Sequence, residues 1–233
     1  MDPAVSLPVQ LDVRGRRCVV VGGGVVGTRR VAALLDAGAQ VVVISPDPAP
    51  ALRTMAAEGS VELVERPFAP EDLDGARLVV AATGVLDVDE AVSTAAGARG
   101  VLVNRSDRAD RGDLAFPAVV RRGPVRLAVS TGGAAPAVTR LVAESVDEGL
   151  DAVLGLDGDG LALLVDVVAE VRRELIEGAY GGPRPGGGAD HEVGVTPGPL
   201  DWRSALDASI LDLIRQGRRA EAKERLLACL SSS

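Results

Sequence analysis

The chain has 233 residues, a formal net charge of -8 at pH 7, and a composition that is 47% hydrophobic but only 2% aromatic. This length suits one large domain or two small ones, with a core built mainly from aliphatic side chains. The negative charge argues against general binding of nucleic acid through phosphate contacts, and no apolar run reaches the length of a membrane span.

Apolar runs alternate with helical segments over the first half of the chain. We expect an edge strand at residues 7–11, core strands at 16–21, 40–45, 61–65, 77–83 and 101–103, and helices at 24–37, between Pro48 and residue 58, and at 87–99. The near-continuous apolar run at 40–45 is typical of a strand buried on both faces of a parallel sheet. Strands that alternate with helices indicate βαβ units with right-handed crossovers, so the sequence predicts an α/β, Rossmann-like fold.

The pattern changes after residue 113. Residues 115–120 and 125–130 flank Arg121-Arg122-Gly123-Pro124, which is typical of a β-hairpin. Helices are expected to begin near residue 134, to run from 160 to 177, and to follow in two parts from 201 to 229, while the Gly/Pro-rich residues 179–199 predict a loop or linker. We therefore expect three regions: a Rossmann domain at 1–113, a hairpin and helix at 114–150, and a helical C-terminal region at 151–233.

A group of glycines follows the first core strand, with the spacing Gly22-x-Gly24-x-x-Gly27. Gly22 would permit a tight turn, Gly24 would let the backbone approach a pyrophosphate, and Gly27 would let the next helix pack closely on the strand. The N-terminus of that helix would offer free N–H groups and a positive dipole end to phosphates. This context predicts a dinucleotide site; the alternative is a glycine turn that binds nothing.

Two further positions lie at strand ends where a dinucleotide would bind. Asp47 follows the second core strand, about 20 residues beyond the glycine turn, where an acid commonly binds a ribose hydroxyl and favours NAD over NADP. Its alternative role is that of a turn or N-cap aspartate. Ala81-Ala82-Thr83 ends the fourth strand, where small residues would let a nicotinamide lie close to the sheet. The alternative there is plain packing.

The densest charged stretch at a predicted ligand edge follows the fifth strand and runs from Asn104 to Arg111. Asp107 can act there as a general acid or base. Arg105 and Arg108 could hold an anionic substrate by charge-assisted hydrogen bonds. The alternative is a solvated loop of mutually paired charges.

A second candidate anion site is the loop Ser130-Thr131-Gly132-Gly133, which precedes a predicted helix with Pro136 in its first turn. The alternative is a helix start that uses glycine for its turn.

Few histidine and cysteine residues are available for metal binding. Cys18 and Cys229 form no CxxC or His/Cys cluster, so the sequence predicts no zinc site. His191, the only histidine, falls in the predicted linker, and its single occurrence excludes a multi-histidine site. Because no secretory signal pattern is found, a reducing cytoplasm is the expected location.

In order and spacing, the motifs together resemble the precorrin-2 dehydrogenase/sirohydrochlorin ferrochelatase family, which forms the N-terminal module of siroheme synthase and also occurs as a free-standing protein. The resemblance covers residues 7 to 150, and the later helices match only in character. It is carried by Val19–Gly27, Ser45–Asp47, Val79–Thr83, Asn104–Asp107, Phe116–Val120 and Ser130–Pro136.

The resemblance implies oxidation of precorrin-2 to sirohydrochlorin with NAD as hydride acceptor, followed in some members by insertion of ferrous iron. The family aspartate that handles protons falls on Asp107. Members are typically homodimers whose hairpin and helical region form the interface, and their serine-rich loop corresponds to Ser130-Thr131-Gly132-Gly133. The family's NAD contacts fall on Gly24, Val25, Val26, Pro46 and Asp47, with Thr83 and Asn104 lining the same cleft.

The chain departs from the family at one charged position. Many members have Asn-Val-Val-Asp where this chain has Asn104-Arg105-Ser106-Asp107, so the aspartate has a more charged environment. Because the substrate carries many carboxylates, we expect several nearby arginines to face it, and we expect loss of Arg105 or Arg108 to raise the substrate KM. The candidates are Arg105, Arg108, Arg111, Arg121, Arg122 and Arg126.

Two other functions stay open on the sequence. The main alternative is an NAD-sensing regulatory Rossmann module without catalysis, which needs neither the hairpin at 116–120 nor the loop at Thr131. The other is a different NAD-dependent oxidoreductase, which lacks its usual catalytic sets here because Tyr180 is the sole tyrosine and Lys223 the sole lysine.

Overall fold

The structure is a computed structural model that describes residues 7–132, 134–180 and 201–231. The chain forms two compact units, Met1–Pro117 with Ser130–Thr139, and Ala118–Val129 with Arg140–Ser233. The division expected from the sequence, at residues 113 and 150, differs from this one. The hairpin packs into one unit with the later helices, whereas the loop that follows the hairpin returns to the first unit.

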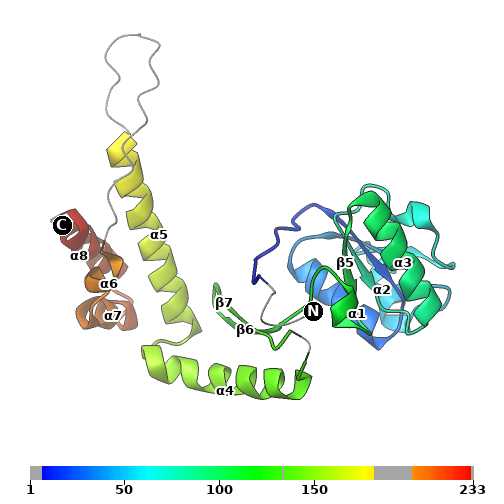
Figure 1. The fold of residues 1–233 in the computed structure, drawn as a ribbon. Helices are drawn as coiled ribbons and strands as arrows, with labels where there is room; N and C mark the ends of the chain where they lie inside the picture. Colours follow the sequence, from blue (N-terminus) through cyan, green and yellow to red (C-terminus); the bar gives the residue numbers. More distant parts are fainter. Residues whose placement is uncertain (1–6, 133, 181–200, 232–233) are drawn as a thin grey trace, which may run out of the picture. The chain divides into compact units, whose positions relative to one another are not determined.

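The first unit is a five-stranded parallel sheet in the order β3-β2-β1-β4-β5. Figure 1 shows this unit with its helices α1, α2 and α3. This confirms the predicted α/β fold. Crevices at the carboxyl ends of such strands, where the strand order reverses, bind ligands, and here the reversal lies between β1 and β4. The strands are β1 Arg17–Val21, β2 Gln40–Ile44, β3 Glu62–Val64, β4 Leu78–Ala81 and β5 Leu102–Arg105. The helices are α1 Val25–Asp36, α2 Pro50–Ala57 and α3 Leu86–Arg99, with the short 3-10 helices η1 Pro70–Leu73 and η2 Ala109–Arg111.

Aliphatic side chains fill both faces of this sheet. Because neighbouring residues of a strand point to opposite faces, Val20 packs in a layer with α1 and α2, whereas Val19 packs in a layer with α3. Each fully buried valine contributes about 1.5–3 kcal/mol relative to an exposed one. The central strands are therefore fixed by burial on both sides, as the apolar run at 40–45 predicted.

The expected edge strand at residues 7–11 is wrong. The segment forms no strand, and Leu7 and Val9 are 81% and 72% exposed. Only Leu11, at the end of this segment, packs against the core of the sheet, and Pro8 lacks the N–H that a strand needs for pairing. The fifth strand also extends two residues further than expected, to Arg105.

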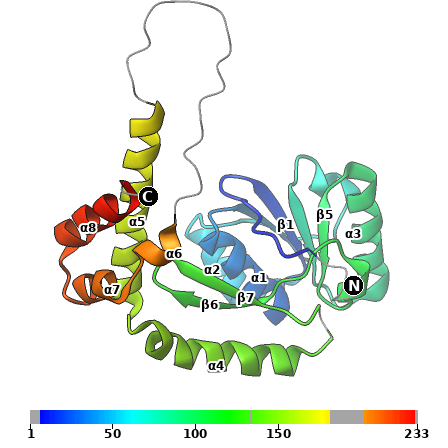
Figure 2. The same cartoon turned by 60° about the vertical axis from the view of Figure 1, so that its left-hand side comes forward.

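The second unit begins with an antiparallel hairpin, β6 Ala118–Arg122 and β7 Val125–Val129, which confirms the hairpin prediction. Its helices are α4 Pro136–Leu154, which starts in the first unit, α5 Gly158–Tyr180, α6 Trp202–Ala205, α7 Ala208–Arg215 and α8 Arg219–Ser231. Helix α5 lies along α7 and α8 (Figures 1 and 2) around a core that includes Val167, Ile210 and Leu226.

The C-terminal helices differ in number from the expected two. Three helices lie in residues 201–231, because Asp207 accepts hydrogen bonds from the N–H groups of Ser209 and Ile210 and so begins α7 separately from α6. Of the predicted linker, Ala179 and Tyr180 belong to α5. The rest of it, including His191, lies outside the described residues.

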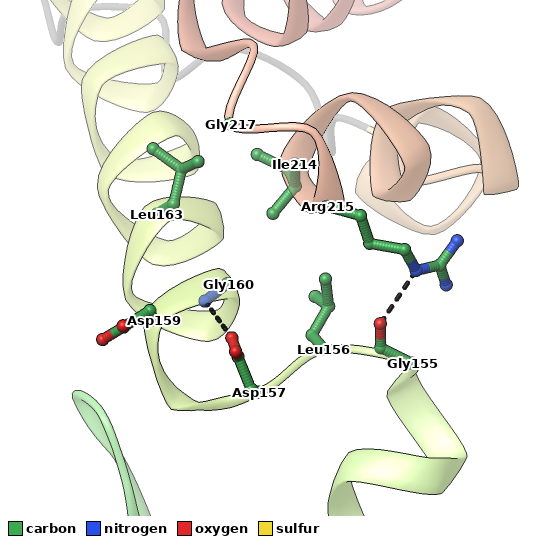
Figure 3. Close-up of a pocket in the computed structure, with 9 residues that line it drawn as sticks. All are labelled: Gly155, Leu156, Asp157, Asp159, Gly160, Leu163, Ile214, Arg215 and Gly217. Atoms are coloured by element: carbon green, nitrogen blue, oxygen red, sulfur yellow. Dashed lines mark hydrogen bonds between the residues drawn. The ribbon is translucent and has the colours of Figure 1, made fainter.

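A pocket of about 370 Å³ lies in the second unit between the turn that joins α4 to α5 and helix α7 (Figure 3). Two of its polar lining residues, Asp157 and Arg215, already have partners. The Asp157 carboxylate accepts from the Gly160 N–H at 2.8 Å and so caps α5, and Arg215 Nε donates to the Gly155 carbonyl at 2.8 Å. These contacts explain the polar lining as helix capping.

Among the helices in the described ranges, not one combines the length and the apolar character needed to cross a membrane.

Candidate active site

The glycine turn between β1 and α1 has the tight geometry expected from its spacing. Gly22 has a φ of +113°, and a Cβ there would lie 2.3 Å from the carbonyl oxygen of Ala82. A Cβ on Gly27 would lie 2.1 Å from the carbonyl oxygen of Gly22. Only glycine fits these two positions, because one needs a left-handed backbone and both need close backbone approach.

Gly24 differs from these two glycines because it faces open space. No atom lies within 4 Å of a Cβ built there, and its backbone is extended, with φ -79°. It is the N-cap of α1, it offers no side-chain cap, and the first turn of the helix contains no acidic residue. The free N–H groups of this turn, at the positive end of the helix dipole, therefore fit the pyrophosphate of a dinucleotide. Val25 and Val26, at 88% and 39% exposed, border the same turn.

The turn is fixed between the ends of β2 and β4. The Gly22 N–H donates to the Ile44 carbonyl, and the Ala49 N–H donates to the Gly23 carbonyl, each at 2.9 Å. The Ala82 N–H donates to the Val21 carbonyl at 2.8 Å. Hence the glycine turn, the segment after β2 and the end of β4 form one continuous edge of the sheet.

Asp47 lies just beyond β2 on this edge, next to the exposed Pro46, and its side chain is 98% exposed. The cation nearest to it, Arg53, lies 3.8 Å away and also forms a 2.9 Å ion pair with Glu65. A 2′-phosphate would meet the Asp47 carboxylate and find Arg53 already paired with carboxylates. This arrangement favours NAD over NADP.

Thr83, at the end of β4, is held by the start of α3. Its N–H and its hydroxyl donate to the carboxylate of Asp89 at 3.1 and 2.7 Å, and its hydroxyl accepts from the Val85 N–H at 3.1 Å. Asp89 is 1% exposed. The Thr83 side chain therefore orders the β4–α3 turn, and its role in cofactor binding stays a prediction.

Asn104 on β5 is 3% exposed, and its Nδ2 donates to the Leu114 carbonyl at 2.9 Å. Within the described residues, its Oδ1 and the hydroxyl of Ser106 are buried without a hydrogen-bond partner. A buried acceptor without a partner is costly, so Asn104 Oδ1 is suited to accept a hydrogen bond from a ligand at the strand end.

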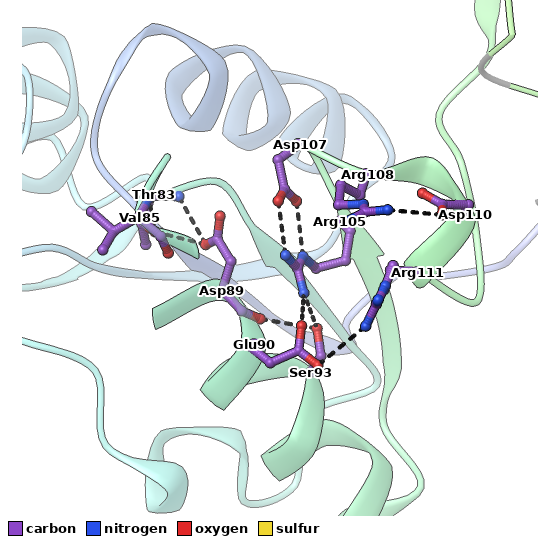
Figure 4. Close-up of polar contacts among 10 residues, drawn as sticks. All are labelled: Thr83, Val85, Asp89, Glu90, Ser93, Arg105, Asp107, Arg108, Asp110 and Arg111. Atoms are coloured by element: carbon purple, nitrogen blue, oxygen red, sulfur yellow. Dashed lines mark hydrogen bonds and ion pairs between the residues drawn. The ribbon is translucent and has the colours of Figure 1, made fainter. Parts of the chain in front are cut away.

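Arg105 and Asp107 form the centre of a polar cluster at the end of β5 (Figure 4). Arg105 Nε and Nη2 donate to the two carboxylate oxygens of Asp107, each at 2.8 Å. Arg105 Nη1 donates to Glu90 at 2.9 Å and to the Ser93 hydroxyl at 3.2 Å. The side chain of Arg105 is 0% exposed, whereas that of Asp107 is 28% exposed.

This geometry corrects the expected orientation of Arg105. We expected its guanidinium to face the substrate, but it points toward α3 and all its donor nitrogens have protein partners. The physical reason is that a buried guanidinium is stable only when carboxylates surround it, and Asp107 and Glu90 supply them. Asp107 remains open on one side.

The protonation of Asp107 follows from this contact. The hydrogen bonds from the Arg105 guanidinium hold the pKa of the Asp107 carboxyl below its usual value, against a smaller opposing effect of burial. Asp107 in turn raises the pKa of Arg105, with a further contribution from Glu90. At neutral pH the cluster thus presents a carboxylate, which can accept a proton rather than donate one.

The other arginines of the stretch are exposed. Arg108 lies 3.5 Å from the Asp110 carboxylate and its side chain is 49% exposed, and Arg111 lies 3.8 Å from Glu90. The alternative of mutually paired charges thus describes the contacts seen in this loop. Arg108 keeps enough exposed guanidinium to meet an anionic substrate.

The side chains of the loop before α4 bond within the loop and to the start of α4. Thr131 Oγ1 accepts from the Ala135 N–H at 3.0 Å and lies 2.9 Å from the Thr139 hydroxyl. The Ser130 hydroxyl accepts from the N–H of Gly132, whose φ is +62°. These bonds fit a glycine-assisted helix start, and substrate binding by Ser130, Thr131 and Gly132 stays a prediction.

Three residues of the cluster were missed by sequence reasoning: Asp89, Glu90 and Ser93, all on α3. Acids near a helix N-terminus are ordinary, because they complement the helix dipole. Only the spacing of Glu90 and Ser93, which places both on one face of a helix, could have indicated a shared contact.

The parallel sheet and the open glycine turn at its switch point define a dinucleotide-binding protein of the Rossmann-like class. In agreement, residues 9–118 match the family model described as "Putative NAD(P)-binding". The comparisons support NAD as cofactor, as the sequence predicted.

Two named relatives and one solved structure indicate which family within this class the chain resembles. Siroheme synthase of Methylobacillus flagellatus is 40% identical over 150 residues, which cover 64% of this chain and 32% of that protein. Siroheme synthase of Methylococcus capsulatus is 34% identical over 221 residues, covering 95% of this chain and 42% of that protein. The solved structure titled "SirC, precorrin-2 dehydrogenase" is 25% identical with a TM-score of 0.58, and the match covers 98% of this chain and 100% of that one.

The comparisons support the family that the motifs predicted, that of precorrin-2 dehydrogenase/sirohydrochlorin ferrochelatase. The chain spans less than half the length of the siroheme synthases that it matches.

Proposed function

We propose that this chain oxidises precorrin-2 to sirohydrochlorin with NAD, in the synthesis of siroheme and related tetrapyrroles. The observation that carries the proposal is the ionised carboxylate of Asp107 at the end of β5, in the same sheet edge as the open glycine turn. The likeness of the whole chain to a precorrin-2 dehydrogenase supports it. The comparisons give no support to a purely regulatory NAD-sensing module.

The oxidation removes one hydride and one proton from precorrin-2. When bound, NAD⁺ would supply the acceptor for the hydride. The first turn of α1 would hold the pyrophosphate and Asp47 a ribose hydroxyl, while Asn104 Oδ1 would orient the nicotinamide end. The Asp107 carboxylate would take the proton from the substrate and then release it to water.

Arg108 is the arginine of this loop that we propose to meet the substrate. Its side chain is half exposed, and a guanidinium binds carboxylates by charge-assisted hydrogen bonds. Arg108→Ala is expected to raise the KM for precorrin-2 while leaving that for NAD unchanged.

Ferrous iron insertion would use the same site, and here iron is a substrate. The reaction needs a base for the pyrrole protons, which Asp107 can provide. However, the permanent positive charge of Arg105 lies 2.8 Å from that carboxylate and opposes the approach of a divalent cation. We therefore propose that dehydrogenation is the main activity and iron insertion the slower one.

We also propose that the chain forms a homodimer through α4 and the hairpin. Three aliphatic residues spaced three and one apart make an exposed stripe on α4: Val138, Leu141 and Val142, at 51%, 63% and 41% exposed. Light scattering should give the mass of two chains, and Leu141→Asp should give that of one.

The reducing cytoplasm remains the expected location.

The activity is tested with the purified chain under anaerobic conditions, with precorrin-2 generated in place and the absorbance of sirohydrochlorin followed with and without NAD. Formation of sirohydrochlorin only when NAD is present supports the proposal. Binding of NAD without any sirohydrochlorin would refute it and would return the regulatory module as the better reading.

A further inference from the structure

Arg105 ends β5, the strand at one edge of the sheet, and yet its side chain is fully buried. It is the largest of the fully buried side chains in the described residues, and the next in size are aliphatic, such as Ile44 and Leu52. A guanidinium in such a place is stable only if every charge is matched by a close partner. The hydrogen-bond partners of Arg105 therefore indicate its role.

Arg105 is held from two sides. On one side, α3 supplies the Glu90 carboxylate at 2.9 Å and the Ser93 hydroxyl at 3.2 Å, and the Ser93 hydroxyl is itself fixed by donating to the Asp89 carbonyl at 2.9 Å. On the other side, two parallel hydrogen bonds of 2.8 Å join Arg105 to both oxygens of Asp107. This bidentate geometry fixes the plane of the carboxylate as well as its position.

The charged groups around Asp107 come from three elements. Its own segment contributes Arg105 and Arg108, α3 contributes Asp89 and Glu90, and η2 contributes Asp110 and Arg111. In the described part of the chain, Arg105 alone of the cations forms an ion pair with Asp107, because Arg108 pairs with Asp110 and Arg111 lies against Glu90. Without Arg105, the nearest fixed charges on α3 would be negative.

We propose that Arg105, anchored by Glu90 and Ser93, is a positioning residue for the dehydrogenation: its two parallel hydrogen bonds hold the Asp107 carboxylate in one orientation toward the proton that leaves the substrate, and its charge lets Asp107 stay ionised in more acidic solution. This inference rests on the proposed function. It means that Arg105, which does not touch the substrate, sets the pH below which kcat/KM falls.

A purely structural role makes different predictions. If Arg105 served only to tie β5 to α3, its loss would lower stability and would reduce the rate by the same factor at every pH. If it sets the charge of Asp107, its loss moves the pH at which Asp107 titrates, and the acid limb of kcat/KM moves with it.

The test uses the full chain and two measurements. The titration of Asp107 is followed by NMR with ¹³C-labelled aspartate, the resonance being identified by its absence in Asp107→Asn. The pH profile of kcat/KM for NAD-dependent precorrin-2 oxidation is measured beside it. The variants are Arg105→Met, which removes the guanidinium, and Arg105→Lys, which keeps the charge but loses the fork.

Arg99→Met is the matched control. It removes another arginine–aspartate pair of the same unit, Arg99 with Asp74 at 2.9 Å, from the far end of α3. It should leave the titration of Asp107 and the pH profile as in the unaltered chain.

We expect Asp107 to titrate below the ordinary aspartate value of about 3.9 in the unaltered chain, and at a higher pH in Arg105→Met. The acid limb of the kcat/KM profile should move to higher pH together with this titration. Arg105→Lys should lie between the unaltered chain and Arg105→Met in both measurements. An unmoved titration in both Arg105 variants, or a loss of rate that is equal at every pH, would overturn the proposal.

The two proposals can fail separately. The NMR titration needs no turnover, so a chain that shows the shift but never oxidises precorrin-2 would refute the proposed function while leaving Arg105 as the determinant of the Asp107 charge. Oxidation of precorrin-2 without any difference in the Asp107 titration would support the proposed function and refute the role of Arg105.

Discussion

The carbonyl oxygen of Ala82, at the end of β4, lies 2.3 Å from the point that a Cβ on Gly22 would occupy, and Gly22 also has a left-handed backbone with φ +113°. The end of β4 and the glycine turn after β1 are therefore in direct backbone contact, at the place where the strand order reverses. A side chain at residue 22 would push these two strand ends apart.

Gly22→Ala should damage both stability and cofactor binding. The variant combines the strain of a positive φ with a clash against backbone, and a strained backbone position of this kind costs about 1–3 kcal/mol. We expect a lower midpoint in urea unfolding and no measurable NAD binding by calorimetry. Unaltered stability would mean that the β4 end yields freely and that the contact is not structural.

Gly24→Ala should separate binding from stability. Its backbone suits alanine and no protein atom lies within 4 Å of the added Cβ, so the fold should change little. A methyl group there would stand where the pyrophosphate must approach, and we expect the Kd for NAD to rise at least about tenfold, which is 1.4 kcal/mol. Gly97→Ala, on α3 and also in open space, is the control: it should leave NAD binding unchanged and should raise stability slightly, because alanine favours a helix more than glycine does. Normal NAD binding by Gly24→Ala would place the pyrophosphate elsewhere.

Asp47→Asn should weaken the preference for NAD over NADP. The substitution removes the charge that would repel a 2′-phosphate and leaves Arg53 with one carboxylate partner, Glu65. The ratio of kcat/KM for the two cofactors should shift several-fold toward NADP, through an improved KM for NADP. A ratio that does not change would show that Asp47 is only a turn residue.

The pair of Arg105 and Asp107 should also make stability depend on pH. Because the folded-state pKa of Asp107 is lowered, its contribution is fully present above the unfolded value of about 3.9 and is lost as the pH falls through the folded value. Asp107→Asn should cost about 1–2 kcal/mol at neutral pH, since Arg105 loses one of its two carboxylates. The difference in Tm between the two proteins should shrink below about pH 4. A constant difference would mean that the pair is not coupled to protonation.

Iron insertion should be slow and should respond to Arg105. Ferrous iron added to sirohydrochlorin under anaerobic conditions is expected to yield siroheme more slowly than the chain oxidises precorrin-2. Arg105→Met should raise insertion relative to dehydrogenation, because it removes the cation beside Asp107. A ratio that falls in Arg105→Met would contradict this electrostatic account.

The sheet could be predicted because its signal is local. Runs such as residues 40–45 are apolar throughout, and the glycines at 22, 24 and 27 have a spacing that few other structures require. The contacts of Arg105 could not be predicted, because a charged residue after a strand gives no sign of which way it points. Its partners Glu90 and Ser93 lie 15 and 12 residues away in the sequence. The false edge strand at 7–11 shows the opposite error, since alternation alone does not create a partner strand.

Asp107→Asn shows whether the Asp107 carboxylate is the base in the oxidation of precorrin-2. The variant is compared with the unaltered chain in an anaerobic assay with precorrin-2 and NAD, and NADH binding is measured by fluorescence. We expect Asp107→Asn to bind NADH as tightly as the unaltered chain. We expect it to form sirohydrochlorin about 10²–10⁴-fold more slowly, which is the range expected for loss of a general base. Sirohydrochlorin formed at an undiminished rate would remove Asp107 from the reaction and contradict the account.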